Sequence, residues 1–158
     1  MSSAEKVDKH ILIIESRFYS EIADELTKGA IQVLNDNSCT YERVQVPGTL
    51  EIPSVIRFAI KSMQLFSGGE RFDGFVALGC VIRGETSHYD HVSQESIGGV
   101  QHLCMEYAIA VGNGILTVDN EEQAWARARV TEGNKGEKAA LACIEMIDLK
   151  NRFGLMRK

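Results

Sequence analysis

The sequence has little of several residue types that would mark a particular class of protein. Its 158 residues include only two prolines and four cysteines, and no two cysteines form a Cys-x-x-Cys pair. This spacing argues against a zinc knuckle or a redox dithiol, so we expect reduced and mostly buried thiols. Seventeen lysines and arginines are outnumbered by 22 aspartates and glutamates. The net charge of −5, without any basic block, argues against a nucleic-acid partner.

Long hydrophobic runs are also missing. No apolar run approaches the ~18 residues of a membrane span, and the polar residues 1–9 lack the apolar core of a signal peptide. We therefore expect a cytoplasmic protein in which 1–9 form a flexible N-terminal segment and the chain forms one domain. Neither GxxxxGK[ST] nor a GxGxxG after the first strand is present, which argues against nucleotide triphosphatases and dinucleotide enzymes.

Short apolar runs alternate with segments of helical period. The runs predict strands at residues 10–15, 41–46, 72–82 and 115–118, and the periodic segments predict five helices, near 22–34, 53–63, 97–111, 120–129 and 140–151. The sequence Gly112-Asn113-Gly114 predicts a turn before the fourth strand. This alternation favours an α/β fold, with a four-stranded, doubly wound parallel sheet and helices on both faces.

The stretch from Gly79 to Val92 is the first candidate for the chemistry. Its polar tip follows a buried strand, where open α/β sheets bind ligands. Gly84 would let the backbone turn tightly, and Thr86 with Ser87 would cap a helix whose free amides attract an anion. His88 beside such an anion site suggests general acid–base work on a phosphorylated or carboxylated substrate. The alternative is a capped helix that carries a surface histidine.

Two further residues stand where earlier strands end. Phe18 follows the first strand, where its ring could stack on a flat ligand or simply pack against the protein. Glu51 lies at the start of the helix after Val46-Pro-Gly-Thr-Leu-Glu-Ile-Pro53, where it could accept from ligand hydroxyls or only stabilise the helix dipole. Position alone leaves both alternatives open.

A metal site is a weaker interpretation of the residues around His88. The candidate ligands would be His88, Asp90, His91 and Glu95. A His-x-x-His pair without the glutamate of a zincin motif is a weak signal, so we expect no metal and no other cofactor.

The motifs together resemble the 6,7-dimethyl-8-ribityllumazine synthase family, whose members catalyse the penultimate step of riboflavin biosynthesis. The likeness covers nearly the whole chain and keeps the order of the family's elements. These elements are Arg17-Phe18, Val46 to Pro53, Gly79 to Tyr89, Glu122-Gln-Ala, Arg127 and Gly133-Asn-Lys-Gly136.

This resemblance implies a flavodoxin-like three-layer sandwich that condenses 5-amino-6-(D-ribitylamino)uracil with 3,4-dihydroxy-2-butanone 4-phosphate. Phosphate and water would leave, and no cofactor would take part. By this likeness Phe18 would stack on the pyrimidinedione, the ribityl chain would be held by Thr49, Leu50 and Glu51, and the ring edge would meet Cys80, Val81 and Ile82. The phosphate would bind the amides of Glu85 and Thr86 and pair with Arg127, with Lys135 as a further pocket cation. His88 would transfer protons.

One position departs from the family pattern. Asn113 stands where many members carry an aromatic residue on the second side of the substrate ring. We expect an altered affinity, because an amide can still hydrogen-bond the pyrimidinedione. The departure leaves open a weakly active or non-catalytic lumazine- or flavin-binding paralogue on the same fold. A flavodoxin-like electron carrier would need a Ser/Thr-rich phosphate loop after the first strand, and Glu15-Ser-Arg-Phe18 is not one.

The resemblance also implies an assembly with shared sites. Family members form homopentamers, and we expect the site to lie between neighbours, with Phe18, Glu51 and Asn113 on one chain. The next chain would contribute the remaining side chains, namely Glu85, Thr86, His88 and Arg127. Capsid-forming relatives tend to carry a glycine-rich run where this chain has Ala128-Arg-Val-Thr-Glu132, which favours a lone pentamer.

Overall fold

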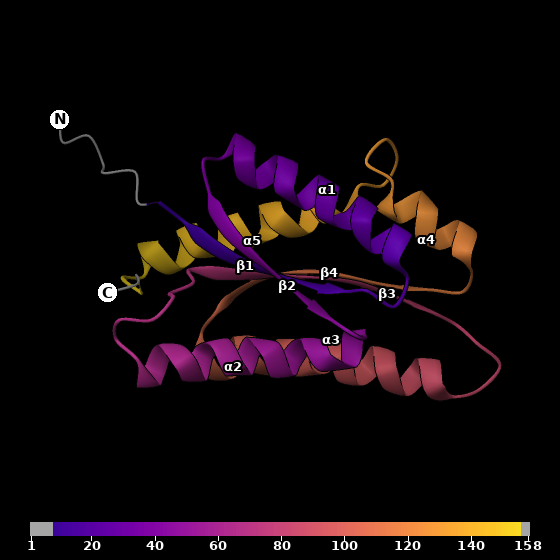
Figure 1. Ribbon diagram of the computed structural model, residues 1–158, viewed down its shortest axis with the longest axis horizontal. Helices are drawn as coiled ribbons and strands as arrows, with labels where there is room; N and C mark the ends of the chain where they lie inside the picture. Colours follow the sequence, from indigo (N-terminus) through magenta and orange to yellow (C-terminus); the bar gives the residue numbers. More distant parts are fainter. Residues whose placement is uncertain (1–7, 156–158) are drawn as a thin grey trace.

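The computed structural model describes residues 8–155, so most of the expected flexible segment 1–9 lies outside the described residues. Strands and helices alternate along this part of the chain (Figure 1). Their bounds are β1 His10–Ser16, α1 Ser20–Asp36, β2 Thr40–Val46, the 3-10 helix η1 Thr49–Glu51, α2 Ile52–Leu65, β3 Gly74–Ile82, α3 His88–Tyr107, β4 Ala110–Val118, α4 Glu121–Ala128 and α5 Lys135–Arg152.

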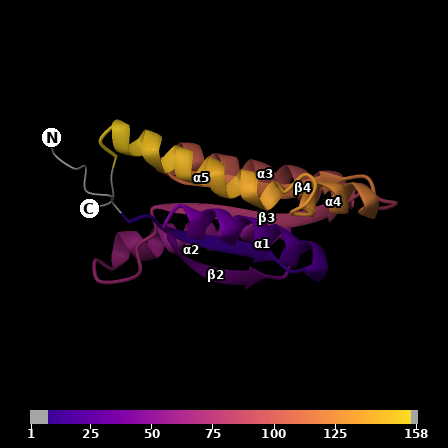
Figure 2. The same ribbon diagram turned by 90° about the horizontal axis from the view of Figure 1, so that it is seen from above.

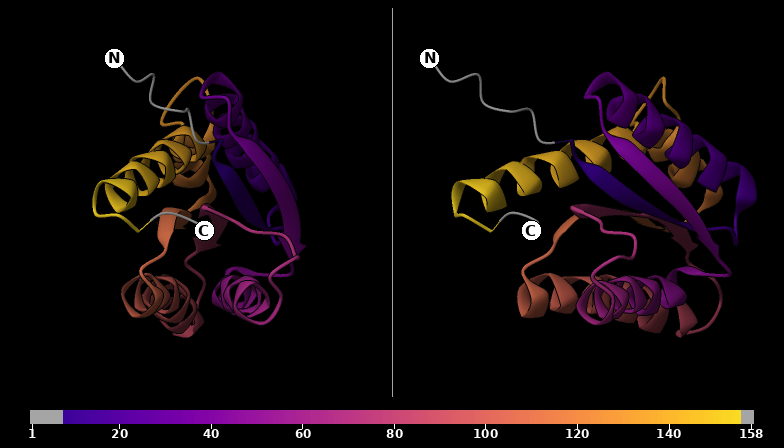
Figure 3. Two further views of the ribbon diagram at one scale, coloured as in Figure 1. Left: turned by 90° about the vertical axis from the view of Figure 1, so that its left-hand side faces the viewer. Right: turned by 60° about the vertical axis from the view of Figure 1, so that its left-hand side comes forward.

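The four strands form one parallel sheet in the order β2-β1-β3-β4. Helices α1, α4 and α5 cover one face of it, and α2 and α3 cover the other (Figures 1 and 3). The prediction of an α/β fold with helices on both faces of a four-stranded parallel sheet is therefore confirmed, and the three layers are those of a flavodoxin-like sandwich.

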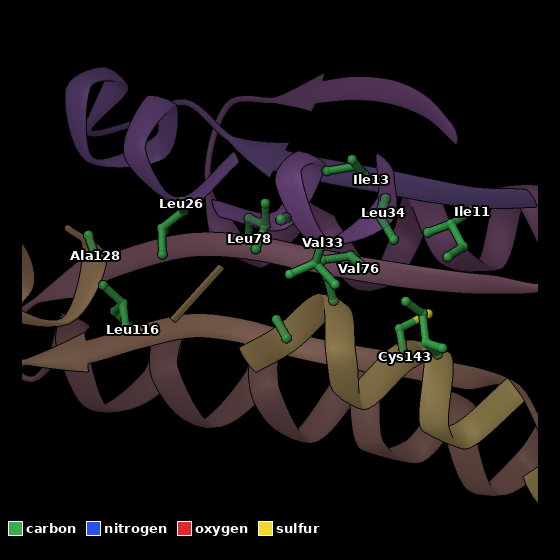
Figure 4. Packing of buried hydrophobic residues seen from close by; sticks show 14 of the residues in the cluster. Ile11, Ile13, Leu26, Val33, Leu34, Val76, Leu78, Leu116, Ala128 and Cys143 are labelled. Atoms are coloured by element: carbon green, nitrogen blue, oxygen red, sulfur yellow. The ribbon is translucent and has the colours of Figure 1, made fainter. Parts of the chain in front are cut away.

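The core is divided by the sheet into two clusters, because side chains alternate between the faces of a strand. In β1, Ile11 and Ile13 pack toward α1 and α5, whereas Leu12 and Ile14 pack toward α2 and α3. Figure 4 shows the first cluster, in which Leu26 and Leu34 of α1 meet the sheet. The inner strands β1 and β3 read as nearly unbroken apolar runs because both of their faces are covered.

The boundary between the third helix and the fourth strand differs from the prediction. Helix α3 ends at Tyr107, Ala108 adopts a left-handed conformation, and β4 already begins at Ala110. The predicted turn at 112–114 is therefore wrong, because these residues pair with β3. Helix α5 runs along β4 (Figure 2), and a Cβ on Gly112 would overlap the Ala139 carbonyl of α5. The glycines allow close packing of a helix on a strand.

Helix α5 returns the chain to the edge where the strands begin. Its last turns approach the start of β1, since Lys9 Nζ lies 3.2 Å from Asp148 Oδ1. The opposite end of the sheet, where the strands finish, carries the connections from β1 to α1, from β2 to α2 and from β3 to α3 (Figure 1). Across residues 8–155, no helix combines the length and apolarity needed to cross a membrane.

We predict that Gly112→Ala destabilises the protein by about 3 kcal/mol, because the added methyl overpacks the contact between β4 and α5. For a chain of this size that loss should lower the thermal midpoint by roughly 6–12 °C. The matched control is Gly68→Ala, where a Cβ would meet nothing within 4 Å. Circular dichroism melts of both variants check the prediction, and an unchanged midpoint for Gly112→Ala would contradict it.

Candidate functional site

A cleft of about 410 Å³ opens at the carboxyl edge of the sheet, within the size range of small-molecule sites. Three connections form it, namely those that follow β1, β2 and β3. Its lining residues are Phe18, Tyr19, Pro47, Gly48, Thr49, Leu50, Glu51, Cys80, Val81, Ile82, Gly84, Thr86, His88, Tyr89 and Val92. Nine residues implied by the resemblance are among them: Phe18, Thr49, Leu50, Glu51, Cys80, Val81, Ile82, Thr86 and His88.

Phe18 and Tyr19 form the wall that follows β1. Phe18 is 72% exposed, and its ring meets the Tyr19 ring edge-on with a centroid distance of 4.9 Å. An aromatic face this open to the cleft can accept a flat ligand. Burial raises the pKa of the Tyr19 phenol, with smaller contributions from Cys80 and Glu121, so its hydroxyl remains a neutral donor.

The second wall is the segment from Pro47 to Glu51. Thr49 is buried, and its Cγ2 lies 2.6 Å from where a Cβ on Gly79 would stand, so a glycine in β3 lets η1 approach the sheet. Glu51 is exposed, and its Oε2 lies 3.1 Å from where a Cβ on Gly48 would stand. No group within residues 8–155 hydrogen-bonds or ion-pairs with this carboxylate, so it is free to accept from ligand hydroxyls.

The third wall is the connection from β3 to α3. Helix α3 begins at His88, and its N-cap Ser87 makes no side-chain cap bond. Instead the hydroxyl of Thr86, the other expected cap residue, accepts from the His88 amide at 3.3 Å. Gly84 does not adopt a left-handed conformation, and a Cβ there would meet nothing within 4 Å. Neither the backbone conformation nor close packing therefore requires glycine at this position.

Arg83 fixes the start of this connection. Its backbone amide donates to Val118 O, its guanidinium reaches Asp119 at 3.1 Å and Asp90 at 3.5 Å, and its Cζ lies 4.2 Å from the centroid of Tyr89. Arg83 carries the only positive charge of residues 83–88, and because it already pairs with Asp119 and Asp90 it is not a free partner for an anion. The loop is held in place, and its amides between Gly84 and Thr86 remain available to a ligand.

The end of β3 forms the floor of the cleft, with Cys80, Val81 and Ile82. Cys80 is buried, and this burial raises the pKa of its thiol to about 12. A thiol with so high a pKa is a poor nucleophile at neutral pH, because the thiolate is the reactive form. Cys80 therefore contributes shape and backbone to the floor.

The cleft of the single chain contains one carboxylate and one imidazole but no cation. His88 is exposed, and no side chain in the described residues bonds to its ring, so the imidazole is free to exchange protons with a ligand. Glu51 is the one carboxylate in the lining, and no lysine or arginine is found among the lining residues. The arrangement can stack a ring, bind hydroxyls and move protons, but it cannot neutralise a dianion through side chains of this chain alone.

Four expected site residues lie outside this cleft. Arg127 donates to the Gln123 carbonyl of its own helix α4 at 3.1 Å, and Lys135 is the first residue of α5. Asn113 lies within β4, where its Oδ1 accepts from the Ile115 amide at 2.9 Å. Glu85 is exposed on the loop that carries Thr86 and is not among the lining residues.

The expected division of the site between two chains is wrong in one respect. Thr86 and His88 were assigned to the neighbour of the chain that carries Phe18 and Glu51, yet all four line one cleft of one chain. They meet because each follows the carboxyl end of one of three adjacent strands, β2, β1 and β3. Arg127 is different, since it lies on α4 and outside the lining.

The structure also bears on the metal interpretation. His88, Asp90, His91 and Glu95 do not come together as a metal-binding group within the described part of the chain. The group that does come together is His10, Glu42 and Glu70, at the opposite edge of the sheet. There the His10 ring already bonds Thr40 Oγ1 at 2.7 Å and Glu70 Oε1 at 2.5 Å, so both of its ring nitrogens are engaged within the protein.

Several lining residues were not anticipated, namely Tyr19, Pro47, Gly48, Tyr89 and Val92. Pro47, Gly48 and Tyr89 belong to motifs in which the predicted roles fell on neighbouring residues. Tyr19 adjoins Phe18, and the position directly after a strand end was the signal that could have found it. Val92 lies one helical turn after His88 on α3, so the same face of the helix predicts it.

Comparison with known proteins agrees with this geometry. Residues 8–151 match the family model described as 6,7-dimethyl-8-ribityllumazine synthase. The chain is 51% identical over 148 residues to the 6,7-dimethyl-8-ribityllumazine synthase of Bartonella bacilliformis, covering 94% of each chain. It is 53% identical over 145 residues to 6,7-dimethyl-8-ribityllumazine synthase 1 of Rhizobium meliloti, and 48% identical over 145 residues to the synthase of Agrobacterium fabrum. These two matches each cover 92% of this chain, and 94% and 97% of the respective relatives.

The pKa of Cys80 generates a prediction about reactivity. At pH 8 the folded protein should alkylate at Cys80 at least tenfold more slowly than the urea-unfolded chain, because burial shifts the thiol pKa from 9.0 to about 12. Peptide mass spectrometry after timed iodoacetamide treatment measures both rates. Because this pKa is higher in the folded state than in the unfolded chain, the neutral thiol contributes fully to the free energy of unfolding below pH 9. That contribution is lost as the pH rises from 9 toward 12. Equal alkylation rates in the two states would contradict the burial.

Proposed function

This chain belongs to the 6,7-dimethyl-8-ribityllumazine synthase family, and we propose that it condenses 5-amino-6-(D-ribitylamino)uracil with 3,4-dihydroxy-2-butanone 4-phosphate. The products are 6,7-dimethyl-8-ribityllumazine, phosphate and water, in the penultimate step of riboflavin biosynthesis. The observation that carries the proposal is the convergence of Phe18, Glu51 and His88 on one cleft. Phe18 can stack on a flat ring, Glu51 can accept hydrogen bonds from hydroxyls, and His88 can transfer protons.

The pyrimidine would stack on the open face of Phe18, with its ribityl hydroxyls directed toward Glu51. Thr49 and Leu50 belong to the same short segment as Glu51 and would hold the ribityl chain. The backbone of Cys80, Val81 and Ile82 would meet the ring edge at the floor. In this arrangement the substrate amine itself attacks the ketone, so the enzyme supplies position and protons and needs no nucleophile of its own.

His88 is the proposed proton carrier. Imine formation, proton removal, elimination of phosphate and ring closure with loss of water each move a proton, and an imidazole can accept and donate protons in these steps. Acid–base catalysis of this kind contributes about 10²- to 10⁴-fold, whereas holding two reactants together contributes on the order of 7 to 11 kcal/mol in ideal geometry. Proximity is therefore the larger effect.

The phosphate site would combine the amides at Glu85 and Thr86 with cations from a second copy of the chain. A phosphate dianion in a cleft without lysine or arginine lacks a charge partner. Arg127 and Lys135 lie outside the cleft of their own chain, and Lys135 has no ion-pair partner within residues 8–155. We propose that these two cations, with Asn113, complete the cleft of a neighbouring subunit.

Because each cleft would need cations from a neighbouring chain, the subunits would form a ring, and we propose a homopentamer with one site at each interface. A head-to-tail contact repeated about a rotation axis closes into such a ring. The segment 128–132 keeps the lone pentamer as the preferred assembly over a larger shell, and light scattering distinguishes the two masses.

A cytoplasmic location also stays a prediction. The free His88 ring favours the enzyme over a non-catalytic lumazine-binding paralogue.

Activity is tested by incubating the purified protein with both substrates and following lumazine absorbance. We predict that His88→Ala lowers the rate by about 10²-fold but leaves it above the uncatalysed reaction, because the two reactants still meet in the cleft. The control is His91→Ala, on the same helix but outside the cleft lining, which should keep the wild-type rate. A His88→Ala protein that binds both substrates without accelerating their reaction would contradict the role assigned to proximity.

The shared site predicts complementation between two impaired variants. His88→Ala removes the base from the cleft, and Arg127→Ala removes the cation that a neighbour supplies. Unfolded together and refolded as mixed rings, about one interface in four should pair an intact cleft with an intact Arg127, so activity rises above either variant alone. Mixing His88→Ala with Glu51→Ala is the control and should not recover, because both side chains line one cleft. Recovery in the control alone would overturn the assignment.

A further inference from the structure

A carboxylate occupies a core position at the end of β1. Side chains alternate along the strand, so Glu15 shares a face with Ile11 and Ile13, which pack in the cluster beneath α1 and α5. Glu15 is fully buried. A carboxylate in this environment is tolerated only when several donors satisfy it.

Donors from three elements converge on this carboxylate. Arg43 of β2 donates from Nε at 2.7 Å to Oε2 and from its terminal nitrogen at 3.0 Å to Oε1. The Thr27 hydroxyl of α1 donates at 3.0 Å. Arg17, in the connection from β1 to α1, adds a longer contact of 3.4 Å. Arg43 and Thr27 alone therefore satisfy most of the buried charge.

Arg17 differs from the other donors because it makes a second ion pair. Its guanidinium lies 2.7 Å from Asp24 on α1, and its backbone amide donates to Val46 O at 3.0 Å. The residue thus joins the end of β1, the end of β2 and the first turns of α1. Phe18, the next residue, is 72% exposed, and within residues 8–155 its only contact with another aromatic ring is the edge contact with Tyr19.

We propose that Arg17 is a positioning residue that sets the Phe18 ring over the cleft, with buried Glu15 as its fixed anchor. The proposal rests on the proposed function, in which Phe18 stacks on the pyrimidine. An exposed ring cannot be oriented by core packing, so its direction follows from the backbone that precedes it. The Arg17 contacts to Glu15, Asp24 and Val46 O hold that backbone from three sides.

The test is a fluorescence titration with 6,7-dimethyl-8-ribityllumazine, which carries the ring and the ribityl chain but no phosphate. Arg17→Met should weaken its binding by about threefold to tenfold, the equivalent of one aromatic contact. Arg17→Lys should recover part of the affinity, because an ammonium can still pair with Asp24. With both substrates, the KM of the pyrimidine should rise while kcat and the KM of the phosphorylated substrate change little.

A double-mutant cycle separates positioning from a direct or purely structural role. If Arg17 acts through Phe18, the double variant of Arg17→Met and Phe18→Ala should bind lumazine no more weakly than Phe18→Ala alone. Arg43→Met is the matched control, since it removes a stronger partner of the same carboxylate. It should lower the thermal midpoint more than Arg17→Met does and leave lumazine affinity unchanged.

Two results would overturn the proposal. One is wild-type affinity in a folded Arg17→Met protein, and the other is a full additional loss in the double variant, which would place the effect of Arg17 outside Phe18. A wild-type protein that neither binds lumazine nor forms it would instead refute the proposed function, and the titration of unmodified protein distinguishes that failure first.

Discussion

The shared direction of the four strands is the constraint on which the rest of the structure depends. Because β2, β1 and β3 are adjacent and parallel, the connections that follow them must meet at one edge of the sheet. Each connection brings one kind of group: an exposed ring after β1, a free carboxylate after β2 and a free imidazole after β3. The cleft is thus a consequence of topology, and the identities of a few side chains decide what it can bind.

Most of the fold could be predicted from local patterns, but the start of β4 could not. Glycine on both sides of Asn113 is a turn signal within any short window, whereas the structure uses Gly112 to admit α5 against the strand. Such a packing requirement involves a helix almost thirty residues away and leaves no trace in the neighbouring sequence. Ala108 similarly ends α3 in a left-handed conformation that glycine or asparagine would ordinarily signal.

For the site, the general rule that ligands bind at the carboxyl ends of parallel strands was more reliable than the division of residues between subunits that the resemblance implied. Phe18, Glu51 and His88 each follow a predicted strand, so the rule for parallel sheets alone would have placed them on one chain. The resemblance identified these residues correctly as members of the cleft but divided them between subunits. What neither source could supply was the buried Glu15, since its anchor role depends on Arg43 and Thr27, which are distant in sequence.

The pairing of Lys9 with Asp148 has a practical consequence for handling the protein. It places the start of β1 and the last turns of α5 together, at the edge of the sheet opposite the cleft. A fluorophore attached to an engineered cysteine beside Lys9 or Asp148 would lie on that side. Such a label would report on the protein without touching the residues that line the cleft.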